Sequence, residues 1–174
     1  QGNNPGVVMT NAEVWFLLAE ATLMGWNTGT TDAEYYKRGV KAAMQLMVDH
    51  YGARISNAEI EAYLAGAGAY NEAAPLEVKL RAINTQAWIL HMTNPAEAWA
   101  NIRRSGYPEL KSPINYIAKK DVIDGETIPV RLCYPLEEKE YNTKAYTEAL
   151  SRMGGTDSWN THVWWDRDSE YCVS

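Results

Sequence analysis

Residues 11–26 read NAEVWFLLAEATLMGW, and this stretch decides what kind of fold the chain adopts. Thr10 stands three positions before Glu13, which is the spacing of a capping box, where side chains satisfy the first backbone N–H groups of a helix. The pattern predicts a helix that runs to about Met24 and stops at Gly25. Because its middle, VWFLLA, is apolar all round, we expect this helix to be buried on more than one side.

Two more capping boxes follow along the chain. Thr31 opens a helix that is expected to run to about Tyr51, and Ser56 opens a short helix to about Leu64. Each start signal is followed by a stop or a loop within a typical helix length. The first half of the chain is therefore expected to be a series of helices joined by short loops.

A fourth helix is predicted to start at Pro75, because proline suits a first helical position whose N–H would have no partner. It is expected to end near Thr93. Its apolar spacing predicts a core stripe made of Leu76, Leu80, Ile83, Ala87 and Leu90.

The segment EAWANIRRSGYPEL, residues 97–110, places two arginines side by side at the end of a fifth helix. Pro95 opens this helix and Gly106 suits the left-handed residue that ends it. Arg103 and Arg104 point about 100° apart around the helix axis, so they cannot share one environment. One is expected to be solvated, and the other to turn toward neighbouring structure.

Two carboxylates of the first helix are the expected partners of these arginines. Glu13 and Glu20 lie on one face, about 10 Å apart along the axis. Glu20 stands in an apolar run, and a buried carboxylate needs a partner cation. We therefore predict a partly buried structural ion pair between Glu13 or Glu20 and Arg103 or Arg104. The alternative is the acid/base pair of an inverting glycosidase, whose range of carboxylate separations these two slightly exceed.

The chain is expected to divide into a helical-repeat portion, residues 1–110, and an irregular C-terminal region, residues 111–174, packed on the helices. In the second part, residues 128–134 (IPVRLCY) favour a short strand. Residues 142–153 favour a last short helix, closed by two glycines. The predicted fold class is mainly α, with paired helices that stack as in helical-repeat proteins and an irregular C-terminal region that contains short strands.

Composition excludes several classes of partner. The 174 residues include 16 basic and 22 acidic side chains, a net charge of −6, which argues against nucleic acid as the main partner. No apolar run is long enough for a transmembrane helix. Seven Trp and eleven Tyr stand against one Phe, and such amphipathic rings suit half-wet surfaces and sugar contacts. Cys133 and Cys172 could form a disulfide or remain free thiols, and their spacing does not decide between these states.

No motif for metal, cofactor or catalysis is present in the sequence. The three histidines are scattered, and neither a phosphate-binding glycine loop nor a nucleophile turn is found. The acidic residues near the end lack the glycine and the spacing of an EF-hand, and we interpret them as solvated: Asp157, Asp166, Asp168 and Glu170. The sequence thus predicts no metal and no cofactor.

Candidate ligand-binding residues are aromatic and amide side chains that stand next to each other in loops, because sugars stack on exposed rings while amides bind their hydroxyls. For Trp26 we expect packing against the end of its own helix more than exposure. For Tyr70, in a loop of small residues, we expect exposure. The candidate pairs are Trp26 with Asn27, Tyr70 with Asn71, and Trp159 with Asn160.

Four stretches together resemble one known family. They are NAEVWFLLAEATLMGW, EAWANIRRSGYPEL, IPVRLCYPLEEKEYN with its Pro-x-Arg and Tyr-Pro-x-x-Glu, and the closing GGTDSWNTHVWWD. In this order they resemble the second half of the SusD-like (SusD/RagB) nutrient-uptake lipoproteins. The resemblance covers nearly the whole chain.

The resemblance implies an α-helical lipoprotein with tetratricopeptide-like helix pairs on the extracellular face of the outer membrane. It implies a binding protein, not an enzyme, which binds glycans or other nutrients and caps a SusC-like TonB-dependent transporter. It also implies that the chain is a fragment of one larger domain and that the N-terminal portion of the same protein is a partner. The turn after Arg104 looks like a structural signature, with one arginine on the carboxylates of the first helix and the other facing the irregular region. The alternative function is a helical-repeat scaffold for protein–protein interaction.

Overall fold

The computed structural model of the chain describes residues 7–110, 128–154 and 156–166. The chain divides into two compact units, Gln1–Pro108 and Glu109–Ser174. Helices make up the regular structure of both units, and the described ranges contain no strand. The mainly α fold class is confirmed.

The first two helices begin where the capping boxes place them. At the start of α1 (Asn11–Leu23), the hydroxyl of Thr10 accepts a hydrogen bond from the backbone N–H of Glu13 at 3.1 Å. At the start of α2 (Asp32–Tyr51), the hydroxyl of Thr31 accepts a hydrogen bond from the backbone N–H of Glu34 at 3.2 Å. Because each hydroxyl satisfies a backbone donor that has no partner within the helix, the chain is committed to a helix at these points.

The other three predicted helices are also confirmed. α3 (Asn57–Ala65) opens with the full reciprocal capping box of Ser56 and Glu59. α4 (Leu76–Leu90) continues into a 3₁₀ turn, η1 (His91–Thr93), and α5 (Pro95–Ser105) begins at its proline. The α5 helix ends at a glycine with φ of +73°, a conformation that costs glycine little because it has no Cβ.

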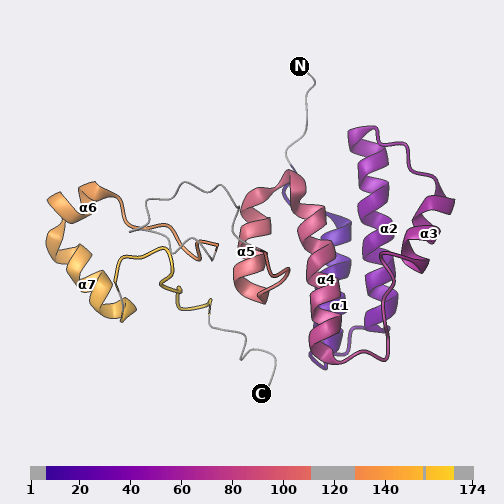
Figure 1. Ribbon diagram of the computed structural model, residues 1–174, viewed down its shortest axis with the longest axis horizontal. Helices are drawn as coiled ribbons and strands as arrows, with labels where there is room; N and C mark the ends of the chain where they lie inside the picture. The colour runs from indigo at the N-terminus through magenta and orange to yellow at the C-terminus, as the bar shows by residue number, and fades with distance from the viewer. Residues whose placement is uncertain (1–6, 111–127, 155, 167–174) are drawn as a thin grey trace. The chain divides into compact units, whose positions relative to one another are not determined.

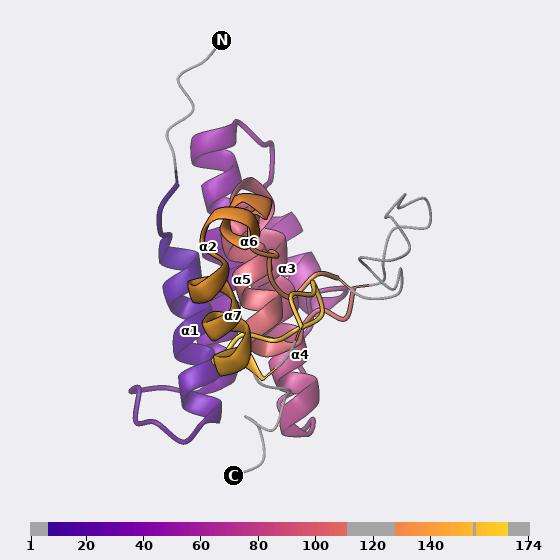
Figure 2. The same cartoon turned by 90° about the vertical axis from the view of Figure 1, so that its left-hand side faces the viewer.

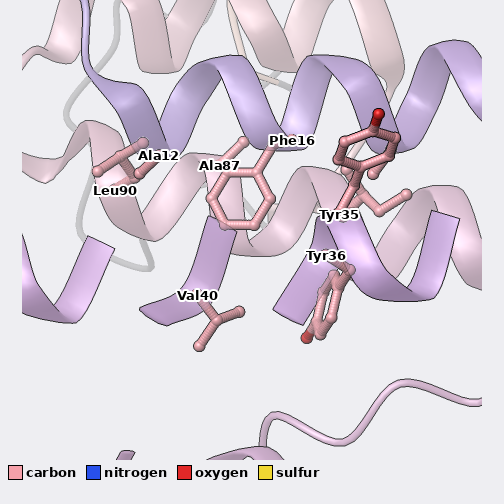
Figure 3. Packing of buried hydrophobic residues seen from close by; sticks show 9 residues of the cluster. Ala12, Phe16, Tyr35, Tyr36, Val40, Ala87 and Leu90 are labelled. Carbon is pink, nitrogen blue, oxygen red and sulfur yellow. The ribbon is translucent and has the colours of Figure 1, made fainter. Parts of the chain in front are cut away.

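The core of the first unit lies where α1, α2 and α4 meet (Figures 1 and 3). Phe16 of α1 and Tyr36 and Val40 of α2 are almost fully buried there, and Figure 3 shows them with Ala87 of α4. A Cβ on Gly39 would come within 2.5 Å of the Phe16 ring, so the glycine allows α1 and α2 to approach closely.

The core stripe of α4 is confirmed in its inner turns and wrong at its first residue. Leu80, Ile83, Ala87 and Leu90 are buried, whereas Leu76 is exposed. Leu76 is the first residue of the helix and precedes the turns that pack on α1. The stripe therefore begins one turn later than the apolar spacing predicts.

The predicted ion pair forms between Glu20 of α1 and Arg104 of α5. Two guanidinium N–H groups donate to the two carboxylate oxygens at 2.5 and 2.8 Å, a bidentate geometry. Arg104 also donates to the side-chain oxygens of Asn84 and Asn101, so the pair belongs to a polar network between α1, α4 and α5. The pair is partly buried, with 17% of the Glu20 side chain and 43% of the Arg104 side chain exposed.

The remaining two members of the predicted set have other contacts. Arg103 places its guanidinium 3.8 Å from the centre of the Trp99 ring, one turn earlier on α5. Glu13 lies 4.0 Å from the imidazole of the buried His91. Arg104 turns toward neighbouring helices as expected, but the other arginine is not simply solvated, because Arg103 is half-buried and lies on Trp99. That Arg103 faces the irregular region stays a prediction.

One face of α1 is apolar and exposed within the first unit. Val14, Leu17 and Met24 follow one another at spacings of three and seven residues, and 45% of Leu17 is accessible to solvent. The core of α1 lies on the other side, at Ala12, Phe16 and Ala19. Within the described residues of the first unit, the expected burial of α1 is therefore incomplete on this face.

The second unit contains two short helices, α6 (Leu136–Tyr141) and α7 (Thr143–Met153) (Figure 2). The last helix is confirmed as α7, whose end at Gly154 has φ of +68°. The α6 helix was not predicted, although Pro135 followed by two glutamates in the first turn is a start signal.

The strand predicted for residues 128–134 is wrong, because the segment is irregular. One backbone hydrogen bond from Val130 to Trp159 at 2.9 Å replaces a ladder. Pro129 has no N–H to donate to a neighbouring strand. The Arg131 guanidinium and the Tyr134 backbone N–H both bind the side chain of Asp157. Val130 therefore joins this irregular segment to the loop that contains Trp159 and does not form part of a strand. That this region packs on the helices stays a prediction.

Candidate functional site

The loop between α1 and α2 presents the most accessible candidate aromatic side chain. Gly25 has φ of +84°, and the backbone N–H groups of Gly25 and Trp26 donate to the carbonyls of Thr22 and Ala21. These two bonds form a Schellman motif, which satisfies the last carbonyls of α1 and fixes the course of the chain. Trp26 is 72% exposed, and Asn27 beside it is also exposed.

Packing of Trp26 against its own helix, which we expected, is therefore wrong. In a Schellman motif the residue at this position often packs against the third residue from the helix end. That residue is Ala21, whose methyl group offers little surface to an indole ring. The backbone is fixed while the ring remains in solvent.

The other end of this loop is held by α2. The hydroxyls of Thr22 and Thr28 lie 2.6 Å apart, and the hydroxyl of Tyr35 donates to the carbonyl of Thr28. Tyr35 itself is buried in the core. Because both flanking helices bind the loop, the position of Trp26 is set by the scaffold.

The second candidate pair, Tyr70 and Asn71, is engaged within the protein. The Tyr70 hydroxyl donates to Asp32 Oδ2 at 2.6 Å, and its ring centre lies 4.6 Å from that of Tyr36. Lys79 pairs with the same carboxylate at 3.1 Å. Asn71 Oδ1 accepts a hydrogen bond from a backbone N–H two residues later.

The expected exposure of Tyr70 is therefore wrong, since the residue is half-buried. Burial, the hydrogen bond to Asp32 and the nearby charge raise the pKa of Tyr70, so its hydroxyl stays protonated and remains a donor. Burial alone would raise the pKa of Asp32. The hydrogen bonds from Tyr70 and Lys79 and the charge of Lys79 outweigh burial and hold that pKa below its usual value.

The third candidate pair lies in the second unit. Trp159 is half-buried, its carbonyl accepts the hydrogen bond from Val130, and its indole N–H is buried without a hydrogen-bond partner among the described residues. Asn160 is exposed, and its backbone N–H donates to the Ser158 hydroxyl at 3.2 Å. A ligand role for this pair stays a prediction.

The second unit is organised around a buried charge pair that sequence reasoning missed. Arg131 is 5% exposed and lies 2.9 Å from Asp157 Oδ1. Tyr146 donates to the other oxygen of Asp157 at 3.3 Å, and the Tyr134 N–H donates to Oδ1. The Pro-x-Arg spacing at 129–131 was a sequence signal, but its partner stands 26 residues away.

We expected the acidic residues near the end to be solvated, and for two of them this is wrong. Asp157 is bound by Arg131, and Asp166 is buried with His162 Nδ1 at 3.2 Å from its carboxylate. Asp168 and Glu170 lie outside the described residues, as does Cys172. Within the described ranges, no three metal-binding side chains come together.

Cys133 is a free thiol in the structure. Its Sγ lies 3.7 Å from the Asp157 carbonyl, and burial together with the Asp157 charge raises the pKa of the thiol. A raised pKa means that the thiol form dominates at neutral pH, so the geometry does not favour a reactive nucleophile.

These features describe helical units in which a loop bound by both flanking helices carries an accessible tryptophan. Comparison with known proteins decides the family. The sequence model for "SusD-like: Susd and RagB outer membrane lipoprotein" matches residues 1–166. The chain belongs to the SusD-like family.

Solved structures agree with this assignment. A SusD-like protein of Bacteroidetes AC2a is 47% identical, with a TM-score of 0.83 over 96% of this chain and 32% of that one. A chitin-binding protein is 40% identical, with a TM-score of 0.75 over 91% of this chain and 33% of the other. A chitin-binding SusD homolog from Flavobacterium johnsoniae is 30% identical, with a TM-score of 0.75 over 93% and 37% of the two chains.

This SusD-like chain spans about a third of the length of these structural relatives. No curated protein sequence matches it. The family is named for outer-membrane lipoproteins, and some of its relatives bind chitin. No helix within residues 7–110, 128–154 and 156–166 has both the length and the hydrophobicity needed to cross a bilayer.

Proposed function

We propose that this chain is part of a cell-surface lipoprotein that binds an oligosaccharide or a similar nutrient without catalysis and delivers it to a SusC-like TonB-dependent transporter. Membership of the SusD-like family and the chitin-binding relatives support this function. Its place is the extracellular face of the outer membrane. The observation that carries the proposal is Trp26, a 72% exposed indole on a loop that both flanking helices hold.

The ring and its neighbour suit a sugar. The C–H face of a pyranose stacks on an exposed indole, while the amide of Asn27 accepts from and donates to hydroxyl groups. A ring held in place loses little freedom on binding, so more of the contact energy appears as affinity. Trp26 and Asn27 thus form the proposed sugar contact.

The other two candidate pairs belong to the same proposal. Trp159 and Asn160 lie in a loop of the second unit, and Asn160 is exposed. Tyr70 and Asn71 stand beside the Asp32 network, which already occupies the Tyr70 hydroxyl. We expect Trp26 to contribute more to binding than Tyr70, because an engaged ring offers less surface to a sugar.

We also propose that the N-terminal portion of the same protein is a partner and covers the exposed face of α1. The apolar stripe of Val14, Leu17 and Met24 supports this, because a stripe of this kind is buried in most stable proteins. The relatives are about three times as long as this chain, so they have further residues that could supply such cover.

The test is calorimetric titration of the full-length protein with a panel of oligosaccharides of N-acetylglucosamine, glucose, mannose and xylose. Replacing Trp26 by Ala should weaken binding by about 1–3 kcal/mol, taking the stacking of bases on aromatic rings as the nearest calibrated case. Trp26→Phe should retain part of the affinity. Tyr141→Ala, at another highly exposed aromatic residue, is the matched control.

Three results would count against the proposal. Unchanged affinity for Trp26→Ala removes this residue from the site, and a loss with Tyr70→Ala at unchanged stability would move the site to that loop. Absence of binding to every member of the panel contradicts the sugar ligand itself.

A further inference from the structure

A groove in the first unit is independent of the Trp26 loop. It lies between α2 and α3, which stand side by side in Figure 1, and Trp15 of α1 contributes to its wall. Its volume is about 370 Å³, within the range of small-molecule sites. None of its lining residues belongs to the six candidates in loops.

The apolar part of the groove is rigid. Ala42 of α2 and the buried Ile60 of α3 contribute to it together with Trp15. Trp15 stacks on Tyr35 with ring centres 5.7 Å apart and an angle of 21°. The guanidinium of Arg38 lies 5.4 Å from the centre of the Trp15 ring. Because a stacked ring and a cation both hold it, the indole is placed before any ligand arrives.

The polar part of the groove comes from two helix faces. On α2, Arg38, Lys41 and Gln45 recur at spacings of three and four residues, so they follow one another on one side over about 10 Å. On α3, Asn57 and Glu61 are the polar members of the lining. Lys41 Nζ and Glu61 Oε1 lie 2.6 Å apart, so an ion pair joins the two helices.

The charges of the groove are already balanced. Arg38 pairs with Glu34 at 3.0 Å, and Lys41 pairs with Glu61 at 2.6 Å. A strongly anionic ligand would have to compete with these carboxylates, and a wholly apolar ligand would desolvate the charged pairs without replacing their hydrogen bonds. A hydroxyl group can accept from Lys41 or Gln45 and donate to a carboxylate or an amide oxygen.

We infer that this groove is a second carbohydrate contact, which takes one or two residues of a neutral oligosaccharide. The inference rests on the proposed function, since it concerns the same class of ligand. A C–H face of the sugar packs on the accessible part of Trp15, which the buried Ile60 supports from below, and its hydroxyls bind the Lys41–Glu61 pair and the amides of Gln45 and Asn57. A long glycan on the cell surface thereby meets two contacts on one scaffold.

The test compares two sites in the full-length protein, with the same panel of oligosaccharides and with calorimetry as the readout. The groove variant carries Gln45→Ala and Asn57→Ala, both at exposed positions outside the core. Loss of two hydrogen bonds should weaken the groove's binding event roughly 10-fold. Lys37→Ala, on α2 outside the groove lining, is the matched control and should leave binding unchanged.

Trp26→Ala separates the inference from the proposed function. Two binding events in the native protein, one weakened by each variant, support both. An unchanged titration of the groove variant beside a loss for Trp26→Ala overturns the groove alone. A loss for the groove variant beside unchanged binding of Trp26→Ala supports the groove and removes Trp26. No binding of any panel sugar to the native protein overturns both.

A crystal of the native protein soaked in N-acetylchitotriose gives a second readout that does not depend on folding of a variant. Sugar packed on Trp15 supports the inference. Sugar bound elsewhere with an empty groove overturns it.

Discussion

Arg104 and Glu20 form a two-pronged ion pair that joins α5 to α1, 84 residues apart in the chain. The hydrogen bond to Glu20 is the largest cause that raises the pKa of Arg104, while burial acts against it. The guanidinium also reaches the amide oxygens of Asn84 and Asn101, and Asn84 is itself buried. One side chain thus connects three helices of the first unit.

We expect Arg104→Ala to lower the free energy of unfolding of the full-length protein by about 2 kcal/mol. A fully buried pair that loses one partner costs about 3–5 kcal/mol, and the exposure of Arg104 reduces that figure. Arg104→Lys should recover only part of the loss, because an ammonium cannot make two parallel bonds to one carboxylate.

Urea unfolding measures the effect, with Lys37→Met as the control at an exposed pair with Glu72. The control should change the free energy of unfolding by less than about 1 kcal/mol. Equal effects of Arg104→Ala and Lys37→Met would show that the Arg104 pair is only a surface contact.

Local signals in the sequence predicted the helices well, for a physical reason. Thr10, Thr31 and Ser56 act on backbone groups three residues away, so the signal and its effect lie in the same short stretch. Such starts are readable without knowledge of the fold. The α6 helix shows that a proline start alone, without an apolar stripe to follow, was too weak a signal.

Side-chain environments were predicted less well because they depend on distant residues. Tyr70 is half-buried because of Tyr36 and of Asp32, which stands 38 residues earlier. Trp26 is exposed because Ala21, the helix residue on which it could pack, has only a methyl side chain. An ion pair of Glu20 could be predicted because its carboxylate stands in an apolar run. Whether its partner is Arg103 or Arg104 could not be predicted from the sequence.

Asp32 should make the protein less stable in acid. Its folded pKa lies below its unfolded value of about 3.9, so its contribution is present above that value and is lost as the pH falls through the folded pKa. We expect Asp32→Asn to lower the free energy of unfolding at pH 7 by about 2 kcal/mol, the usual worth of hydrogen bonds to a charged group.

The same variant should also flatten the loss of stability that the native protein shows as the pH falls below the unfolded pKa of an aspartate, about 3.9. Urea unfolding at a series of pH values tests this, with Glu72→Gln as the control at an exposed pair. If the free energy of unfolding of the native protein and of Asp32→Asn changes with pH in the same way, the ionisation of Asp32 does not contribute to stability.

Gly39 is required where α1 and α2 approach. A Cβ at this position would meet the Phe16 ring at 2.5 and 2.7 Å, closer than side chains come without a shift. We expect Gly39→Ala to cost about 1–3 kcal/mol, the usual range for overpacking a core. Alanine is otherwise the better helix former, so a stabilising effect would contradict the close packing.

A double-mutant cycle separates overpacking from other causes. Phe16→Leu removes the ring that the new methyl group would meet, at the cost of core contacts of its own. In its presence, Gly39→Ala should cost less than in the native background. Additive effects of the two changes would show that Phe16 is not the obstacle.

The exposed face of α1 predicts a difference between the isolated chain and the full-length protein. Leu17 is 45% exposed here, and if the N-terminal portion covers it, a charge at this position would be buried only in the longer protein. We expect Leu17→Lys to lower the free energy of unfolding of the full-length protein by about 1.5–3 kcal/mol or more, the worth of a buried leucine. In the 174-residue chain alone it should have little effect, because the lysine remains in solvent.

His50→Lys, at an exposed position in the last turn of α2, is the control in both proteins. When the two portions are produced as separate chains, Leu17→Lys should also weaken their co-purification while His50→Lys should not. If Leu17→Lys destabilises neither protein, or both equally, another part of the molecule covers this face or none does.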